Sequence, residues 1–183
     1  MKRAKWIWKK NPKPDEYVVF FDEINFDDVP VMMDISVAGD YALYVNERLI
    51  SFGQYPDYEN YKVFDRLALT PYLKKGKNEL KILAWYIGKD LLTSYDFGAG
   101  LMYEVYSGNT VLAYSRQGVL CKLSETYQSH QNKLITAQLG FSYKYDTRNL
   151  DKKADVEFAV QVKGFGESLY ERPNKNCGLL RGL

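Results

Sequence analysis

The sequence predicts an all-β fold, an antiparallel β-sandwich of the jelly-roll type. Short runs rich in Val, Ile, Tyr and Phe alternate apolar and polar residues, many gaps between them have the length of a hairpin turn, and no stretch of helical periodicity separates them. Because a parallel sheet needs long crossovers between its strands, these observations favour antiparallel pairing. The expected strands are Tyr17–Phe21, Val31–Val37, Tyr41–Val45, Arg48–Phe52, Lys62–Phe64, Glu79–Tyr86, Leu101–Tyr106, Thr110–Tyr114, Gly118–Lys122, Leu139–Tyr145 and Val156–Lys163.

Turns and irregular segments divide these runs. Asn46-Glu47 is expected to form a two-residue hairpin link, since Asn tolerates the positive φ of a type I′ turn, and Ser107-Gly108-Asn109 closes a second hairpin. The polar stretch 123–138 is expected to be a long loop with room for one helical turn. Residues 170–183 lack alternation and predict a linker to a further domain, which leaves 1–169 as one β-sandwich domain, with strands at 139–163 completing its second sheet.

Composition and charge indicate a folded chain with no strongly charged partner. The 183 residues are 46% hydrophobic and 26% charged, with a net charge of +2, which indicates neither nucleic acid nor an anionic membrane as the partner. The first 13 residues carry six basic and no acidic side chains. We interpret them as a solvated segment whose Trp6, Ile7 and Trp8 pack onto the domain; an arm that binds RNA or DNA is the alternative.

Targeting signals and cysteine usage point to the cytoplasm. Lys9 and Lys10 follow Trp8 directly, so the basic start has no apolar core of a signal peptide, and no stretch is long enough to span a membrane. A cytoplasmic location is therefore expected. Cys121 and Cys177 lie far apart and define no disulfide scaffold, so both thiols are expected to be reduced.

The residues carry no recognisable catalytic motif. His130 is the single histidine, which excludes a His-centred zinc site, and no Gly-x-Ser-x-Gly motif accompanies it. Gly98-Ala99-Gly100 and Gly164-Phe165-Gly166 lack the strand-to-helix context of phosphate loops and are interpreted as turns. No acid/base pair can be assigned, because the separation of two carboxyl groups in space decides it. No cofactor is expected; calcium held by loop oxygens stays open as an alternative.

A tyrosine-rich loop suggests carbohydrate binding. Residues 52–61 interleave tyrosines with Asp, Glu and Asn around Pro56. A pyranose has an apolar face that stacks on aromatic rings and hydroxyls that bind carboxylates, so this combination suits a sugar. The predicted carbohydrate-binding residues are Tyr55, Asp57, Tyr58, Tyr61, Tyr95 and Asp96. The alternative is that these tyrosines pack the loop onto the sheet. Trp85, at the end of an alternating run, is expected in the core.

Several segments, in order along the chain, resemble a known family. They are Ala4–Trp8, Ile35–Asn46, Val63–Asp65, Thr70–Leu80, Gln138–Phe141, Tyr145–Arg148 and Tyr170–Pro173. Over residues 4–173 the chain resembles the N-terminal β-sandwich region of bacterial alpha-L-rhamnosidases, a class of glycoside hydrolase. The resemblance implies a galactose-binding-like jelly roll. It also implies that acidic residues of a separate helical toroid domain hydrolyse terminal rhamnose.

Three functions remain open from the sequence. The leading hypothesis is a non-catalytic accessory domain that binds a rhamnose-containing oligosaccharide weakly or packs against the catalytic domain of its parent chain. The second is a purely structural or interaction domain whose exposed aromatic residues pack against other domains. The third is a complete small hydrolase. Neither nucleic acid nor a membrane is an expected partner in any of the three.

Overall fold

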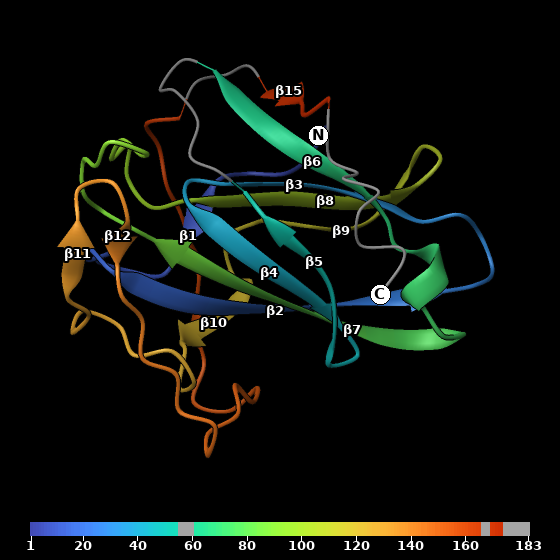
Figure 1. Cartoon of the computed structure of the whole chain (residues 1–183). Helices are drawn as coiled ribbons and strands as arrows, with labels where there is room; N and C mark the ends of the chain where they lie inside the picture. Colours follow the sequence, from blue (N-terminus) through green and yellow to red (C-terminus); the bar gives the residue numbers. More distant parts are fainter. Residues whose placement is uncertain (55–60, 166–168, 174–183) are drawn as a thin grey trace, which may run out of the picture.

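Two β-sheets pack face to face in the computed structural model, which describes residues 1–54, 61–165 and 169–173. One sheet has seven strands, the facing sheet has six, and a separate small sheet has two (Figure 1). The predicted all-β sandwich is confirmed.

The strands have the following bounds. They are β1 (Ile7–Trp8), β2 (Glu16–Phe26), β3 (Met32–Val37), β4 (Asp40–Val45), β5 (Arg48–Gly53), β6 (Lys62–Ala68), β7 (Gly76–Tyr86), β8 (Leu101–Ser107), β9 (Thr110–Tyr114), β10 (Leu120–Leu123), β11 (Leu134–Thr136), β12 (Gly140–Phe141), β13 (Glu157–Phe158), β14 (Val160–Gln161) and β15 (Leu169–Glu171). The seven-stranded sheet has the order β14-β1-β8-β3-β6-β15, with β9 also paired to β8, the six-stranded sheet has the order β13-β10-β2-β7-β4-β5, and β11 pairs with β12. A 3-10 turn, η1 (Thr70–Tyr72), contains Pro71 near its start. No helix of the described residues has the length and apolar character needed to cross a membrane.

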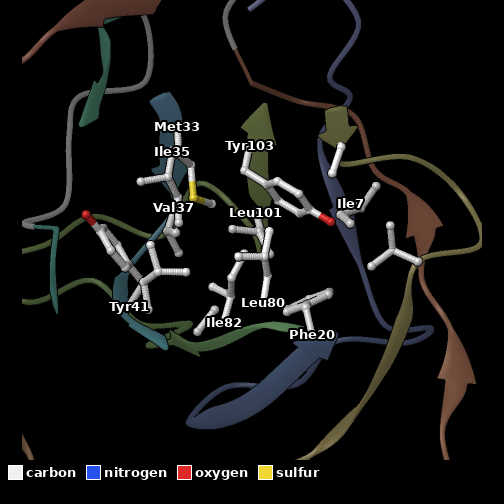
Figure 2. Close-up of a cluster of buried hydrophobic side chains, with 14 of the residues drawn as sticks. Ile7, Phe20, Met33, Ile35, Val37, Tyr41, Leu80, Ile82, Leu101 and Tyr103 are labelled. Atoms are coloured by element: carbon white, nitrogen blue, oxygen red, sulfur yellow. The ribbon is translucent and has the colours of Figure 1, made fainter. Parts of the chain in front are cut away.

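The main core lies between the two sheets. Figure 2 shows Ile35 and Tyr103 from the seven-stranded sheet pointing toward Phe20 and Ile82 from the six-stranded sheet. These side chains are almost completely removed from water. Burial of large apolar side chains on facing sheets is what holds such sandwiches together, at about 1.5–3 kcal/mol for each one fully buried.

The central strand β2 is apolar on both faces. Val18 and Phe20 point into the main core, whereas Tyr17, Val19 and Phe21 form a second buried cluster on the outer face of the same sheet. A strand covered on one side only would alternate apolar and polar residues. The continuous apolar run therefore has a physical reason, because residues beyond β10 cover this outer face.

The predicted hairpins are present. Asn46 and Glu47 have φ values of 50° and 65°, as a type I′ turn requires, and they join β4 to β5. Gly108, with a φ of 54°, lies in the turn between β8 and β9. The expected run Val156–Lys163 is divided into β13 and β14, which belong to different sheets. Fully buried Ala159 lies at the point where the chain passes from one sheet to the other.

Three expectations about irregular segments need correction. Residues 123–138 contain strand β11 in place of a helical turn, and the expected run Leu139–Tyr145 is a strand only at β12. Strand β15 includes Tyr170 and pairs parallel to β6, so the expected boundary at 169/170 lies within a strand. These short strands lack enough residues to show an alternation of their own. Residues 174–183, the rest of the expected linker, lie outside the described residues.

The basic N-terminal segment is attached to the sandwich. Ile7 and Trp8 are fully buried, and β1 pairs with both β8 and β14. Just before it, the carboxylate of Glu104 accepts hydrogen bonds of 2.6–3.2 Å from the backbone N–H groups of residues 2–4. The segment therefore packs onto the domain, as the sequence interpretation expected.

Candidate functional site

The described members of the predicted sugar site have separate surroundings. Tyr61 stacks on Tyr170, with ring centroids 4.6 Å apart, whereas the ring of Tyr95 lies 6.1 Å from that of Phe97. The Asp96 carboxylate accepts hydrogen bonds from the Tyr86 hydroxyl and the Gly98 amide, both at 2.9 Å, so it shapes the local turn. Tyr55, Asp57 and Tyr58 lie outside the described residues. Carbohydrate binding by these six residues stays a prediction.

A buried lysine lies beside the predicted loop. Lys62 is 2% exposed, and its Nζ lies 4.5 Å from the centroid of the Phe97 ring and 5.6 Å from that of Phe165. Phe165 also stacks on Trp6 at 4.3 Å. A Cβ at position 100 would lie 2.6 Å from the Phe165 ring, so a glycine is needed there. This aromatic cluster joins β6 to the N-terminal segment and has a structural role.

A row of aromatic rings crosses the outer face of the six-stranded sheet. Tyr17 on β2 and Trp85 on β7 are opposed in the register and stack with centroids 5.3 Å apart and planes 5° from parallel. Tyr127, which follows β10, also stacks on Tyr17, with ring centroids 5.0 Å apart. We call Tyr127, Tyr17 and Trp85 the aromatic row. Its spacing matches the separation of neighbouring strands, because adjacent elements each contribute one ring.

Asp40 occupies the next position of the same row. It is the register partner of Trp85 across β4 and β7, and it points outward because Tyr41, the next residue, points into the main core. Within the described parts of the chain, its carboxylate has no hydrogen bond or ion pair. Burial raises the pKa of this carboxyl to about 6. Gly39 permits the close approach of β4 to β7, since a Cβ there would lie 2.0 Å from the Trp85 carbonyl oxygen.

Asp15 fixes the orientation of Trp85. The buried Asp15 carboxylate accepts hydrogen bonds from the Trp85 indole at 3.2 Å and from the side-chain amide of Asn132 at 2.9 Å. The Asp15 carbonyl accepts a further hydrogen bond from the backbone of His130 at 2.7 Å. These contacts hold the indole and the loop around residue 130 together. His130 thus lies in a loop contact, and none of its described contacts forms a catalytic arrangement.

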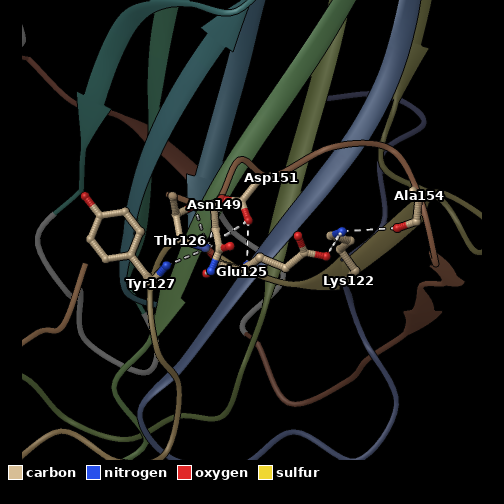
Figure 3. Close-up of polar contacts among 8 residues, drawn as sticks. Lys122, Glu125, Thr126, Tyr127, Asn149, Asp151 and Ala154 are labelled. Atoms are coloured by element: carbon tan, nitrogen blue, oxygen red, sulfur yellow. Dashed lines mark hydrogen bonds and ion pairs between the residues drawn. The ribbon is translucent and has the colours of Figure 1, made fainter. Parts of the chain in front are cut away.

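Asp151 holds the segment that carries Tyr127. Its carboxylate accepts hydrogen bonds from the hydroxyls of Ser124 and Thr126 and from the backbone N–H of Glu125 at 2.6 Å (Figure 3). Lys122 adds an ion pair to Glu125 at 2.5 Å and a hydrogen bond to the backbone carbonyl of residue 154. The outer-face position of Tyr127 is therefore set by polar contacts between segments distant in sequence.

Two further tyrosines flank the aromatic row. Tyr143 and Tyr145 lie 6.1 Å and 4.8 Å from the Tyr127 ring, and they are 67% and 51% exposed. On β4, the outward Tyr44 contacts Lys81, whose Nζ lies 4.8 Å from the ring centroid. Aromatic faces and a carboxylate are thus gathered on one side of the sheet.

The sequence predicts no site on this face. It predicts Trp85 in the core, but Trp85 is half-buried on the outer face and lies outside the main core. The available signal was the alternation of β7, in which Ala84 and Trp85 must point to opposite faces. Pairing with Tyr17, Asp40 and Tyr127 could not be deduced, because it depends on strand order.

The described residues offer no ready metal centre. No group of three or more His, Cys, Asp or Glu side chains that could hold a metal ion occurs among them. Cys121 is a buried free thiol, and burial raises its pKa to about 12, so it is a poor nucleophile and ligand. Cys177 lies outside the described residues.

Comparisons with solved structures identify the class of fold. The chain is similar to part of a GH78 family rhamnosidase of Bacillus sp. GL1, with a TM-score of 0.82 and 20% identity over 93% of this chain and 20% of that one. An alpha-L-rhamnosidase from Dictyoglumus thermophilum gives a TM-score of 0.64 at 20% identity, covering 92% of this chain and 22% of that chain. No family model and no curated sequence matches the chain.

A lectin has a related fold. The Pleurotus ostreatus lectin gives a TM-score of 0.56 at 18% identity, over 88% of this chain and 42% of that one. The chain is therefore a β-sandwich of the class found within alpha-L-rhamnosidases, which confirms the family resemblance at the level of the fold. It spans about a fifth of the length of the rhamnosidases that it matches.

Proposed function

We propose that this β-sandwich is a non-catalytic accessory domain of an alpha-L-rhamnosidase-like glycoside hydrolase and that it binds carbohydrate weakly. The observation that carries the proposal is the fold similarity over 93% of this chain to about a fifth of a GH78 family rhamnosidase. A lectin with a related fold adds support. The jelly-roll and galactose-binding-like character, the N-terminal position in the parent and the cytoplasmic location belong to the same proposal.

Hydrolysis is assigned to a catalytic domain of the parent chain, which would be the macromolecular partner of this domain. The carboxylates of Asp15, Asp96 and Asp151 accept hydrogen bonds from other parts of the domain and so have structural roles. The single histidine contacts the backbone of Pro14. These observations favour binding over catalysis by the chain itself.

The proposal is tested by titrating the 183-residue chain with L-rhamnose and with rhamnose-containing oligosaccharides, with and without calcium, while tryptophan and tyrosine fluorescence is recorded. A saturable change supports carbohydrate binding, and its absence with every sugar contradicts it. Incubation with an aryl rhamnoside should release no product. If the chain releases product and a substitution of an acidic residue abolishes the activity, the chain is a hydrolase and the non-catalytic assignment is wrong.

A specific surface favours packing against another domain as the second candidate function. Leu92, Ile135 and Leu139 are 78%, 56% and 68% exposed, and the backbone hydrogen bond from Leu92 to Ala137 brings their segments together. Exposed apolar patches commonly mark interaction surfaces. Analytical ultracentrifugation distinguishes the two: self-association that Leu139→Ser abolishes supports a packing surface, whereas a monomer at high concentration contradicts it.

A further inference from the structure

Among the described residues, the aromatic row ends at Trp85. Tyr127, Tyr17 and Trp85 follow one another at 5.0 and 5.3 Å, and the next strand in the sheet is β4, with Asp40 opposite Trp85. Among the described residues, Tyr17 is the one ring that stacks on Trp85. A planar or chair-shaped group continuing the same spacing would lie over Asp40 with one face against the indole.

The outward side chains beside Trp85 at the start of β4 are short. Asp40 and Ala42 are the outward residues at the start of β4, whereas Tyr44 follows on the same face of the strand. On β5 the register partner of Ala42 is Phe52, which is 66% exposed. Large aromatic side chains therefore border the start of β4, whose outward side chains are only a carboxylate and a methyl group.

The Asp40 carboxylate lacks a donor. Carboxylates that are withdrawn from water are usually paired with hydrogen-bond donors, because an unpaired one loses its hydration without replacement. Asp40 has no such partner within the described residues, and burial raises its pKa to about 6. Near neutral pH it remains mainly ionised and can only accept hydrogen bonds. A ligand that brings hydroxyl donors would satisfy it, whereas an anion would be repelled.

We propose that the outer face of the six-stranded sheet is a carbohydrate-binding site, in which a pyranose stacks on Trp85 as the fourth member of the aromatic row and donates two neighbouring hydroxyls to Asp40. This inference rests on the proposed function, since it takes carbohydrate binding as given, and it places the sugar on the outer face of the sheet, away from the tyrosine-rich loop. The C–H face of a pyranose suits an indole, and adjacent hydroxyls match the two oxygens of one carboxylate.

Hydrogen bonds within the protein fix the aromatic side chains of the proposed site. Asp15 orients the Trp85 indole, and Asp151 holds the segment from which Tyr127 completes the other end of the row. Side chains fixed in this way lose little conformational entropy on binding. The rings at both ends of the row are therefore held in place before any sugar binds.

The test follows the indole N–H resonances of the full chain by ¹H–¹⁵N NMR during titration with L-rhamnose, D-galactose and D-glucose. Trp85→Phe assigns the Trp85 signal, and the fully buried Trp8 provides an internal reference. We expect at least one sugar to shift the Trp85 signal saturably and leave that of Trp8 in place. Asp40→Asn should weaken this sugar about tenfold or more, because a hydrogen bond to a charged group is lost.

Asp28→Asn is the matched control, since it makes the same chemical change at an exposed carboxylate in the turn between β2 and β3, outside both the outer-face site and the tyrosine-rich loop. Retained affinity in this variant together with weakened binding in Asp40→Asn supports the site. If a sugar binds with unchanged affinity in Asp40→Asn, the outer-face site is wrong while the proposed function stands. If no sugar binds the unaltered chain, both fail. Binding of tetramethylammonium in place of every sugar would assign the position to a cation and overturn the proposal.

Discussion

Asp40→Asn is expected to stabilise the fold, and the gain should depend on pH. Burial raises the pKa of the Asp40 carboxyl from 3.8 to about 6. An acid whose pKa is raised by folding destabilises the native state once it must ionise, so the penalty is absent below about pH 4, grows as the pH rises, and is complete above about pH 6. At about 1.4 kcal/mol per pKa unit the full penalty would be ~3 kcal/mol, which partial exposure reduces to about 1–2 kcal/mol.

Urea unfolding of the parent chain and the Asn variant at about pH 4 and about pH 7.5 measures this effect. The difference in unfolding free energy between the two proteins should move in favour of Asn by about 1–2 kcal/mol between the two pH values, a change of several degrees in Tm for a chain of this size. Tyr17 does not titrate in this range, because burial, with the charge of Asp15, raises its pKa further. An equal difference at both pH values would refute the reasoning, since it would mean that Asp40 is not desolvated. A residue that weakens the fold while strengthening sugar binding would be explained by function.

Three further predictions concern the supporting structure. Glu104→Gln should lower the unfolding free energy at neutral pH by about 1–3 kcal/mol. Burial alone would raise the pKa of Glu104, but the N–H groups of residues 2–4 hold this pKa below its usual value. The difference in unfolding free energy between the two proteins should therefore shrink as the pH falls through the lowered pKa. Urea unfolding that gives the same difference at acid pH would contradict this. In hydrogen exchange, Asp151→Ala should leave the main-core amides protected but remove protection from the loop amides that donate hydrogen bonds to this carboxylate, such as that of Glu125. Continued protection of those loop amides would show that other contacts hold the loop. Leu43→Ala should lower the unfolding free energy by about 2–5 kcal/mol, since the side chain is fully buried. Leu92→Ala should change it by less than about 0.5 kcal/mol, since that side chain is 78% exposed. Similar values for the two variants in thermal unfolding would place Leu43 outside the core.

Much of the fold could be predicted because its strands are long enough to show their own periodicity. The run Tyr41–Val45 alternates between the core and the outer face, and the Asn46-Glu47 turn that follows requires the positive φ that the structure has. Strands of two or three residues could not be predicted in this way. Strand β15 forms because it pairs with the edge of β6, and the sequence of β15 contains no alternation from which a strand could be predicted.

Sequence and structure lead to the same proposed ligand, a carbohydrate, but to different candidate sites for it. The association of tyrosines with carboxylates indicated carbohydrate binding, but the sequence placed it in the loop around Tyr58, which lies outside the described residues. Tyr17, Trp85 and Asp40 come from three separate strands, and Tyr127 completes the aromatic row from a segment held by Asp151. No local sequence pattern predicts that these residues are neighbours.

The sequence by itself determined the all-β class, the principal hairpins and the apolar runs that form the core, because alternation and turn chemistry act between residues that are close along the chain. Tertiary structure alone decided the order of the strands, and with it which outward residues meet on one face. Trp85 shows the difference: its direction follows from the alternation of its own strand, but its stacking on Tyr17 and its position beside Asp40 follow from the pairing of β7 with β2 and β4.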